Sequence, residues 1–261
     1  MWGPEPVRLC TEDGIVLAAE YYAGVSTGPS ASPGYLLGHG FTGSAARPEI
    51  RFVAQHLNER GSSVLAVSFR GHGRSGGRSS VGADEVADVA AGLHWLRLRR
   101  PDVPIVSLGF SMGASVAVRH AGLAAQTGRP GPDAVIAVSG PGRWYERGTK
   151  PMRRLHFGVE TRLGKLVLAR ALKTRIGAGW ELLPVSPVEV AGAICQPLLV
   201  VHGDADPYFP LDHPRMLAGT APRAELWIER GMGHAENATG AGLLDRMDEW
   251  ARAAVSATMD R

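Results

Sequence analysis

Apolar residues recur along the chain in two alternating patterns, short continuous runs and stripes with a helical period. Continuous β-branched runs predict buried parallel strands, and stripes at intervals of three and four residues predict helices packed by one face. The predicted strands are 35–38, 63–69, 103–108, 133–138, 197–202 and 224–229. The predicted helices are about 46–60, 83–99, 112–126, 211–219 and 240–257. Such alternation predicts an α/β fold, with a mostly parallel central sheet and helices on both faces.

The first residues follow a different pattern, which predicts a β-hairpin. The runs 7–11 and 15–22 flank Glu12-Asp13-Gly14, a sequence typical of a tight turn. We therefore expect two antiparallel strands before the alternation begins.

The stretch from 105 to 113 carries the clearest chemical signal. The apolar run 105–108 leads at once into Gly109-Phe110-Ser111-Met112-Gly113, and a helical pattern follows. Small residues at 109 and 113 let the strand and the helix approach closely while Ser111 takes a strained turn conformation. The hydroxyl then stands exposed at the end of the strand, as a nucleophile that needs activation by a base requires. Ser111 is therefore the candidate nucleophile.

A second stretch, Gly73-Arg74-Ser75-Gly76-Gly77, has the same Gly-x-Ser-x-Gly spacing. Ser75 lies several residues past its strand, and a polar loop follows it instead of a helix. The spacing is meaningful only between a strand and a helix, so we interpret this stretch as a structural loop. It also lacks the Gly-Lys-Ser/Thr of a phosphate-binding loop.

Two further strands end in residues that could complete a catalytic set with the serine. The run 198–201 leads into His202-Gly203-Asp204-Ala205-Asp206, and the strand 224–229 leads into Gly233-His234. A serine, an acid and a histidine thus follow three strands in the order Ser, Asp, His. That order separates this arrangement from the two other common folds with a catalytic triad.

With these motifs, the chain resembles the α/β-hydrolase superfamily, and within it the small esterases and monoacylglycerol-lipase-like members. The resemblance covers nearly the whole chain except about 141–193. It implies a triad of Ser111, His234 and Asp206, because Asp206 fits the His-Gly-x-x-Asp pattern of related hydrolases. Asp204, the nearer aspartate, is expected to shape the turn. The loop His39-Gly40-Phe41 implies oxyanion donors at the backbone N–H groups of Phe41 and Met112.

The activity that the resemblance implies is hydrolysis of a carboxylic ester through an acyl-enzyme intermediate, without a cofactor. The same residues also serve thioesterases, C–C hydrolases and perhydrolases, so these remain alternatives. A non-enzymatic small-molecule receptor on the same fold is a further alternative. The expected partner is a small-molecule ester, acyl or lipid-like in character.

The segment 141–193, which interrupts the alternation, lies where the superfamily often carries a cap over its active site. It is short, so we expect a single domain over 1–261 with a small helical lid inserted there. Within 162–173, apolar side chains are expected on one helical face and basic ones on the other. The segment 143–175 is strongly basic, which leaves open a solvated lid surface, attraction of anionic substrates or weak contact with a membrane surface.

Composition narrows the function classes further. The net charge is +3, too small to argue for nucleic-acid binding. No run reaches the roughly 18 apolar residues of a membrane span, and the first residues carry no signal-peptide pattern. Cys10 and Cys195 have no metal or redox spacing, which favours a reducing, cytoplasmic location. Asp204 and Asp206 lack a nearby histidine cluster, so no metal site is expected.

Overall fold

The strands of the protein form one central sheet. The structure, a computed structural model, describes residues 3–25, 32–178 and 183–259. The strands are β1 (Glu5–Cys10), β2 (Val16–Tyr22), β3 (Gly34–Gly38), β4 (Val64–Val67), β5 (Ile105–Phe110), β6 (Ala134–Val138), β7 (Leu198–Gly203) and β8 (Ala224–Glu229). Their spatial order is β1-β2-β4-β3-β5-β6-β7-β8.

Strand direction divides the sheet into two parts. The hairpin strand β1 pairs antiparallel with β2, and β2 pairs antiparallel with β4. All the remaining pairs, from β4 through β3 and β5 to β8, are parallel. The turns that leave β3, β5, β7 and β8 therefore gather at one edge, the carboxyl edge of the parallel strands.

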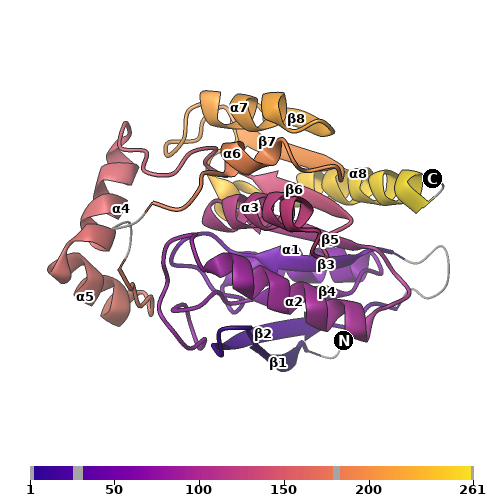
Figure 1. Ribbon diagram of the computed structural model, residues 1–261, viewed down its shortest axis with the longest axis horizontal. Helices are drawn as coiled ribbons and strands as arrows, with labels where there is room; N and C mark the ends of the chain where they lie inside the picture. Colours follow the sequence, from indigo (N-terminus) through magenta and orange to yellow (C-terminus); the bar gives the residue numbers. More distant parts are fainter. Residues whose placement is uncertain (1–2, 26–31, 179–182, 260–261) are drawn as a thin grey trace.

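Helices cover the sheet on both faces (Figure 1). The helices around the sheet are α1 (Pro48–Glu59), α2 (Glu85–Arg99), α3 (Met112–Thr127), α6 (Pro187–Ala191), α7 (Asp212–Thr220) and α8 (Ala241–Met259). Successive side chains along each strand point to opposite faces of the sheet, so each strand contributes to both layers. Tyr35 and Leu37 pack in the core formed with α1 and α8, whereas Leu36 between them packs in the core formed with α2. The predicted fold class is confirmed. The strands and helices α1, α2, α3, α7 and α8 end within a few residues of the predicted positions, whereas α6 lies inside the segment 141–193 and was not predicted.

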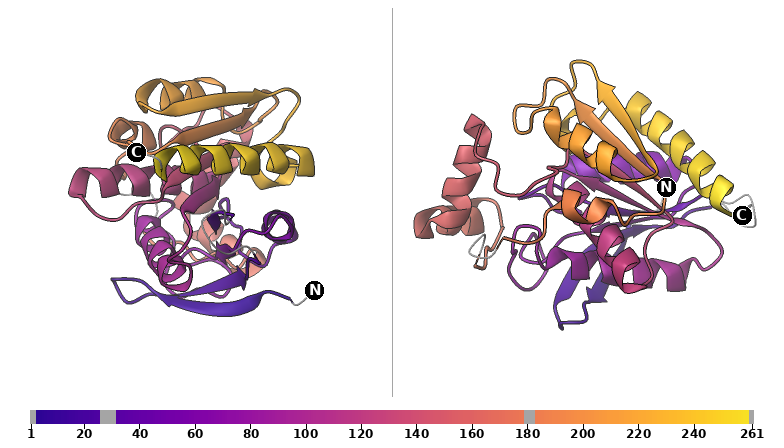
Figure 2. Two further views of the ribbon diagram at one scale, coloured as in Figure 1. Left: turned by 90° about the vertical axis from the view of Figure 1, so that its right-hand side faces the viewer. Right: turned by 45° about the horizontal axis from the view of Figure 1, so that its top comes forward.

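The connection between β6 and β7 forms a separate outer layer. It contains α4 (Lys150–Glu160) and α5 (Arg162–Ala171), which stand apart from the sheet in Figure 1 and in the right panel of Figure 2. Of the predicted segment 141–193, residues 179–182 lie outside the described part of the chain. No helix in the described part is both long and apolar enough to cross a bilayer.

The expected amphipathic helix at 162–173 is present, but its apolar face is largely uncovered. Leu168 packs partly against the core beside α2, as expected for a buried face. Leu163 and Val167, by contrast, are 61% and 53% exposed, and Leu172 is 38% exposed. Because α5 stands beyond the sheet, its main helical neighbour in the described part of the chain is α4, and one side of its apolar stripe faces solvent.

Candidate active site

Ser111 lies at the sharp turn between β5 and α3. Its backbone has φ 50° and ψ −116°, a conformation that side-chain-bearing residues rarely adopt. The turn is tight enough that a Cβ on Gly109 would lie 2.3 Å from the carbonyl oxygen of Gly113. A Cβ on Gly113 would lie 2.6 Å from the carbonyl oxygen of Gly38 on the neighbouring strand. Both glycines of the motif are therefore required by close backbone approach.

His234 joins Ser111 to Asp206. The Nε2 atom of His234 lies 2.9 Å from Ser111 Oγ, and its Nδ1 atom lies 2.7 Å from Asp206 Oδ2. A carboxylate beside Nδ1 places the imidazole proton on that nitrogen, because an ionised carboxylate only accepts hydrogen bonds. The Nε2 atom is then free to accept the serine proton.

The Asp206 carboxylate is buried and well supplied with hydrogen-bond donors. Burial alone would raise the pKa of Asp206. The hydrogen bond and charge of His234, together with the Tyr208 N–H, outweigh burial and hold the pKa below its usual value. Its Oδ1 atom accepts hydrogen bonds from the backbone N–H groups of Tyr208, at 2.7 Å, and Phe209, at 3.2 Å. The acid therefore stays ionised and fixed in direction.

The imidazole of His234 is also held by packing. The Tyr208 ring stacks on it with centroids 4.2 Å apart, and the Phe209 ring lies 5.7 Å away. The next residue, Ala235, has φ 53° and donates its N–H to Ser139 Oγ at 3.1 Å. These contacts limit rotation of the ring away from Ser111.

The loop after β3 brings a second turn to the same place. Phe41 follows Gly40, and the Gly43 N–H closes the turn onto the Gly40 carbonyl at 2.9 Å. Among the described residues, neither the Phe41 N–H nor the Met112 N–H donates a hydrogen bond, so both donors are available. Free backbone N–H groups beside a serine hydroxyl can bind a developing negative charge.

His39 holds this loop from inside the protein. Its Nδ1 lies 2.7 Å from the Gly40 carbonyl, and its Nε2 accepts the Phe69 N–H at 3.0 Å. Burial lowers the pKa of His39 to about 3, so the ring stays neutral and can both donate and accept.

A small pocket opens beside Ser111, with a cavity volume of about 30 Å³. The apolar side chains that line it are Phe41, Val81, Met112, Trp144, Met152, Leu155 and Phe209. Four of its other lining residues, Pro141, Arg143, Tyr145 and Glu146, come with Trp144 from the start of the 141–193 segment. This segment therefore forms part of the pocket wall.

The family model for serine aminopeptidases of the S33 type matches residues 35–178, more than half of the chain. The chain belongs to this family. It is thus an α/β hydrolase of the esterase- and lipase-like branch, as its motifs indicated.

Individual relatives agree with this assignment. A monoacylglycerol lipase from Mycolicibacterium smegmatis is 28% identical over 240 residues, which cover 74% of this chain and 77% of the lipase. An esterase from Pyrococcus furiosus superposes with a TM-score of 0.74 at 24% identity, over 97% of this chain and 91% of the esterase. A thermophilic esterase from Thermogutta terrifontis superposes with a TM-score of 0.69 at 20% identity, over 96% and 99%. At these identities, the two structures show a shared fold.

Ser75 and Asp204, the second serine and the second aspartate that the sequence offered as candidates, have structural contacts instead. Ser75 is buried, and its hydroxyl donates to the Ser68 carbonyl at 2.5 Å and accepts the Ala18 N–H at 2.9 Å. Asp204 accepts the Gly231 N–H at 2.6 Å, which ties together the turns that follow β7 and β8. Neither residue makes a hydrogen bond to Ser111 or His234 among the described contacts.

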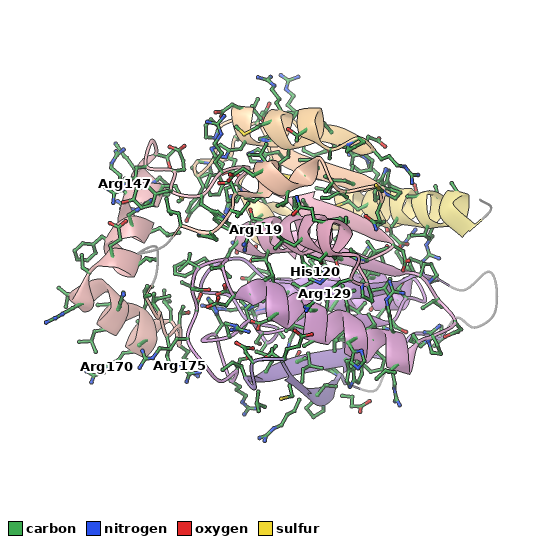
Figure 3. The ribbon with its side chains drawn as sticks, viewed as in Figure 1. Arg119, His120, Arg129, Arg147, Arg170 and Arg175 are labelled. Atoms are coloured by element: carbon green, nitrogen blue, oxygen red, sulfur yellow. The ribbon has the colours of Figure 1, made fainter. Side chains whose placement is uncertain are left out.

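The basic segment 143–175 is partly neutralised by its own contacts. Arg147 pairs with Glu160 at 2.7 Å, and the buried His156 bonds to the same carboxylate. The side chains of Lys165 and Arg175 donate to the carbonyl groups of Gly177 and Ser75. Figure 3 shows Arg147 beside α4 and Arg170 and Arg175 near α5, away from Arg119 and His120 in α3.

Two residues at the site carried no sequence signal that we used. Tyr208 stacks on His234, and Glu236 accepts the Gly40 N–H at 3.1 Å. Each lies two residues beyond a triad candidate, Asp206 or His234. That adjacency is the only local clue, because the contacts of Glu236 span 196 positions of the chain.

Proposed function

We propose that the protein is a serine hydrolase that cleaves carboxylic esters through an acyl-enzyme on Ser111. The observation that supports this most strongly is the continuous hydrogen-bonded series from Ser111 Oγ through His234 to Asp206, at 2.9 and 2.7 Å. Acyl transfer requires a serine that is hydrogen-bonded to a base, and a base that is oriented by an acid.

In the proposed reaction, Ser111 Oγ attacks the acyl carbon while His234 Nε2 takes the serine proton. The N–H groups of Phe41 and Met112 bind the oxyanion of the tetrahedral intermediate. His234 then gives the proton to the leaving oxygen as the C–O bond breaks. Water attacks the acyl-enzyme by the reverse sequence of proton transfers and releases the acid. Asp206 stabilises the protonated imidazole throughout.

The character of the pocket supports an apolar acyl or alcohol group in the substrate. Trp144, Met152 and Leu155 line it together with Phe41 and Phe209, so most of the wall is hydrocarbon or aromatic ring. A substrate that buries apolar surface there gains about 25 cal/mol per Å². A monoacylglycerol lipase among the relatives is consistent with a lipid-like ester. We further propose that segment 141–193 is a lid inserted in a single domain.

We also propose that α4 and α5 make weak contact with anionic lipid surfaces. Phe157, Leu163 and Val167 are each more than half exposed, and Arg154, Arg162 and Arg170 lie exposed on the same two helices. Exposed apolar side chains beside basic ones are typical of helices that lie in a membrane interface. The contact would bring lipid-like esters near the pocket.

A fluorophosphonate probe tests the proposed nucleophile directly. The wild-type protein should be labelled, and Ser111→Ala should not be labelled while it remains folded by circular dichroism. A panel of aryl esters of increasing acyl length, monoacylglycerols, thioesters and an aminoacyl amide would then define the bond that is cleaved. A folded wild-type protein that neither reacts with the probe nor turns over any ester would favour the receptor alternative.

A further inference from the structure

Glu236 connects two loops of the site that are far apart in the sequence. It lies in the short 3₁₀ helix Ala235–Ala238, directly after His234. Its Oε1 atom accepts the N–H of Gly40 at 3.1 Å, in the loop that follows β3. The loop that carries the base is thereby joined to the loop that carries Phe41.

The carboxyl group of Glu236 lies close to the nucleophile. A Cβ placed on Gly40 would lie 3.0 and 3.1 Å from the two carboxyl oxygens and 3.3 Å from Ser111 Cβ. Gly40 therefore lies between Glu236 and Ser111, where even a methyl group would fit only if one of its neighbours shifted. A small shift of Glu236 would let Gly40 move, and Phe41 with it, since the two residues are consecutive.

The other end of this connection is rigid. Ala235 is fully buried, has φ 53° and donates its N–H to Ser139 Oγ at 3.1 Å. Ser139 follows β6, which pairs with β5, the strand that leads into Ser111. Glu236 therefore extends towards Gly40 from a residue that is buried and hydrogen-bonded to the end of β6.

The hydrogen bond to Gly40 does not need a charge on Glu236. Burial raises the pKa of Glu236, although the backbone N–H groups of Glu236 and Gly40 and the charge of His234 act in the opposite direction. The neighbouring carboxylate of Glu49 raises the pKa further. The carbonyl oxygen of a protonated carboxyl group still accepts a hydrogen bond. A glutamine side chain has the same length and offers the same kind of oxygen.

We propose that Glu236 is a positioning residue, which holds Gly40 so that the Phe41 N–H points to the oxyanion formed at Ser111. This inference rests on the proposed function, because it assigns a role in the same reaction. Oxyanion donors act through accurate placement, and the loss of one donor costs about 10²- to 10³-fold in kcat. An oxyanion donor that is displaced should lower kcat less than one that is missing.

Two matched substitutions separate the effect of the length of the Glu236 side chain from the effect of its charge. Glu236→Gln keeps the reach and removes the charge, so it should retain kcat for an aryl ester within about 3-fold. Glu236→Asp keeps the charge and is one methylene shorter, so it should lose about 10- to 100-fold in kcat, with KM changed less than about 3-fold. Glu229→Gln is the control, because Glu229 pairs with Arg246 on the surface at 2.9 Å. It should leave kcat and KM unchanged.

The outcomes distinguish this inference from the proposed function. Glu236→Asp with wild-type kcat, or Glu236→Gln as impaired as Glu236→Asp, would overturn the positioning role while labelling of Ser111 stands. A wild-type protein that reacts with no fluorophosphonate and no ester would instead overturn the proposed function. If Glu236→Asp does not fold, Gly40→Ala supplies a second test, since its methyl group would lie 3.0–3.3 Å from Glu236 and Ser111 and either the Glu236 carboxyl group or the loop would have to shift. It should then lower kcat to a similar extent, and wild-type kcat in that variant would also contradict the inference.

Discussion

Asp206 and His234 are joined at 2.7 Å by one carboxylate oxygen, while the other oxygen of Asp206 is held by the backbone after β7. The acid is thus anchored before it orients the base. Asp206→Asn would place an amide beside Nδ1 and favour the wrong imidazole tautomer. As for the same substitution in serine proteases, kcat should fall by roughly 10⁴-fold while the protein stays folded. Steady-state kinetics with an aryl ester measures this.

Asp204 provides the matched control for that substitution. Its carboxylate accepts the Gly231 N–H at 2.6 Å and does not contact His234 among the described contacts. Asp204→Asn should cost about 1 kcal/mol of unfolding free energy, measured with urea, and leave kcat of the folded protein near the wild-type value. Loss of kcat in Asp204→Asn with retention in Asp206→Asn would reverse the assignment of the acid.

The two Gly-x-Ser-x-Gly serines should respond in opposite ways to alanine. Ser111→Ala should lower ester turnover by at least about 10⁴-fold, because triad members act as a unit. Ser75→Ala should keep its activity per folded molecule but lose about 1–3 kcal/mol of stability, since it leaves the buried Ser68 carbonyl and the half-buried Ala18 N–H without these hydrogen bonds. Probe labelling together with urea unfolding checks both expectations, and an inactive but fully folded Ser75→Ala would contradict them.

Buried neutral histidines should make the protein sensitive to acid. Burial lowers the pKa of His120 from 6.5 to about 4. His120 therefore stays unprotonated in the folded state at pH values below 6.5 at which the unfolded state binds a proton there. The contribution of His120 is complete above pH 6.5 and is lost as the pH falls towards 4, by about 1.4 kcal/mol per pH unit. Unfolding free energies measured between pH 7.5 and 4.5 should fall accordingly.

His120→Leu isolates this contribution, because it removes the titrating group from a buried site on α3. The variant should show a shallower fall of stability between pH 6.5 and 4.5 than the wild-type protein. His94→Leu is the control, since His94 lies on the exposed side of α2. Equal slopes in the wild-type protein and His120→Leu would show that this histidine does not govern acid unfolding.

Charge reversal on α5 tests the proposed contact with anionic lipid. Arg162→Glu combined with Arg170→Glu should reduce cosedimentation with phosphatidylserine-containing vesicles and leave turnover of a short soluble ester unchanged. The difference should shrink at high salt, because surface charges are screened. Arg129→Glu, at the end of α3 and away from these helices, is the control. Equal vesicle binding by all three proteins would exclude the contact.

Sequence patterns predicted the features that depend on local requirements. The motif around Ser111 was readable because the close approach at Gly109 and Gly113 excludes larger residues whatever lies farther away. The order of serine, acid and histidine followed from the strands that precede them. Geometry at the site joins the predicted triad side chains, and their catalytic roles stay a prediction for the experiments above.

Other features depend on distant contacts and escaped the sequence analysis. We did not predict α4, whose basic run and Pro151 obscure the helical pattern, although Thr149 caps its start. The exposure of Leu163 could not be read from an amphipathic pattern, because the pattern does not say whether another element covers the apolar face. The bond between Glu236 and Gly40 spans 196 positions and appears only after folding.

The backbone conformation of Ser111 lowers the stability of the fold at the position that the proposed activity requires. A residue with φ 50° and ψ −116° costs about 1–3 kcal/mol unless it is glycine. A library selected only for heat resistance should therefore enrich Ser111→Gly, a variant that is more robust and catalytically dead. Thermostabilisation of this hydrolase by directed evolution consequently needs an activity screen in every round.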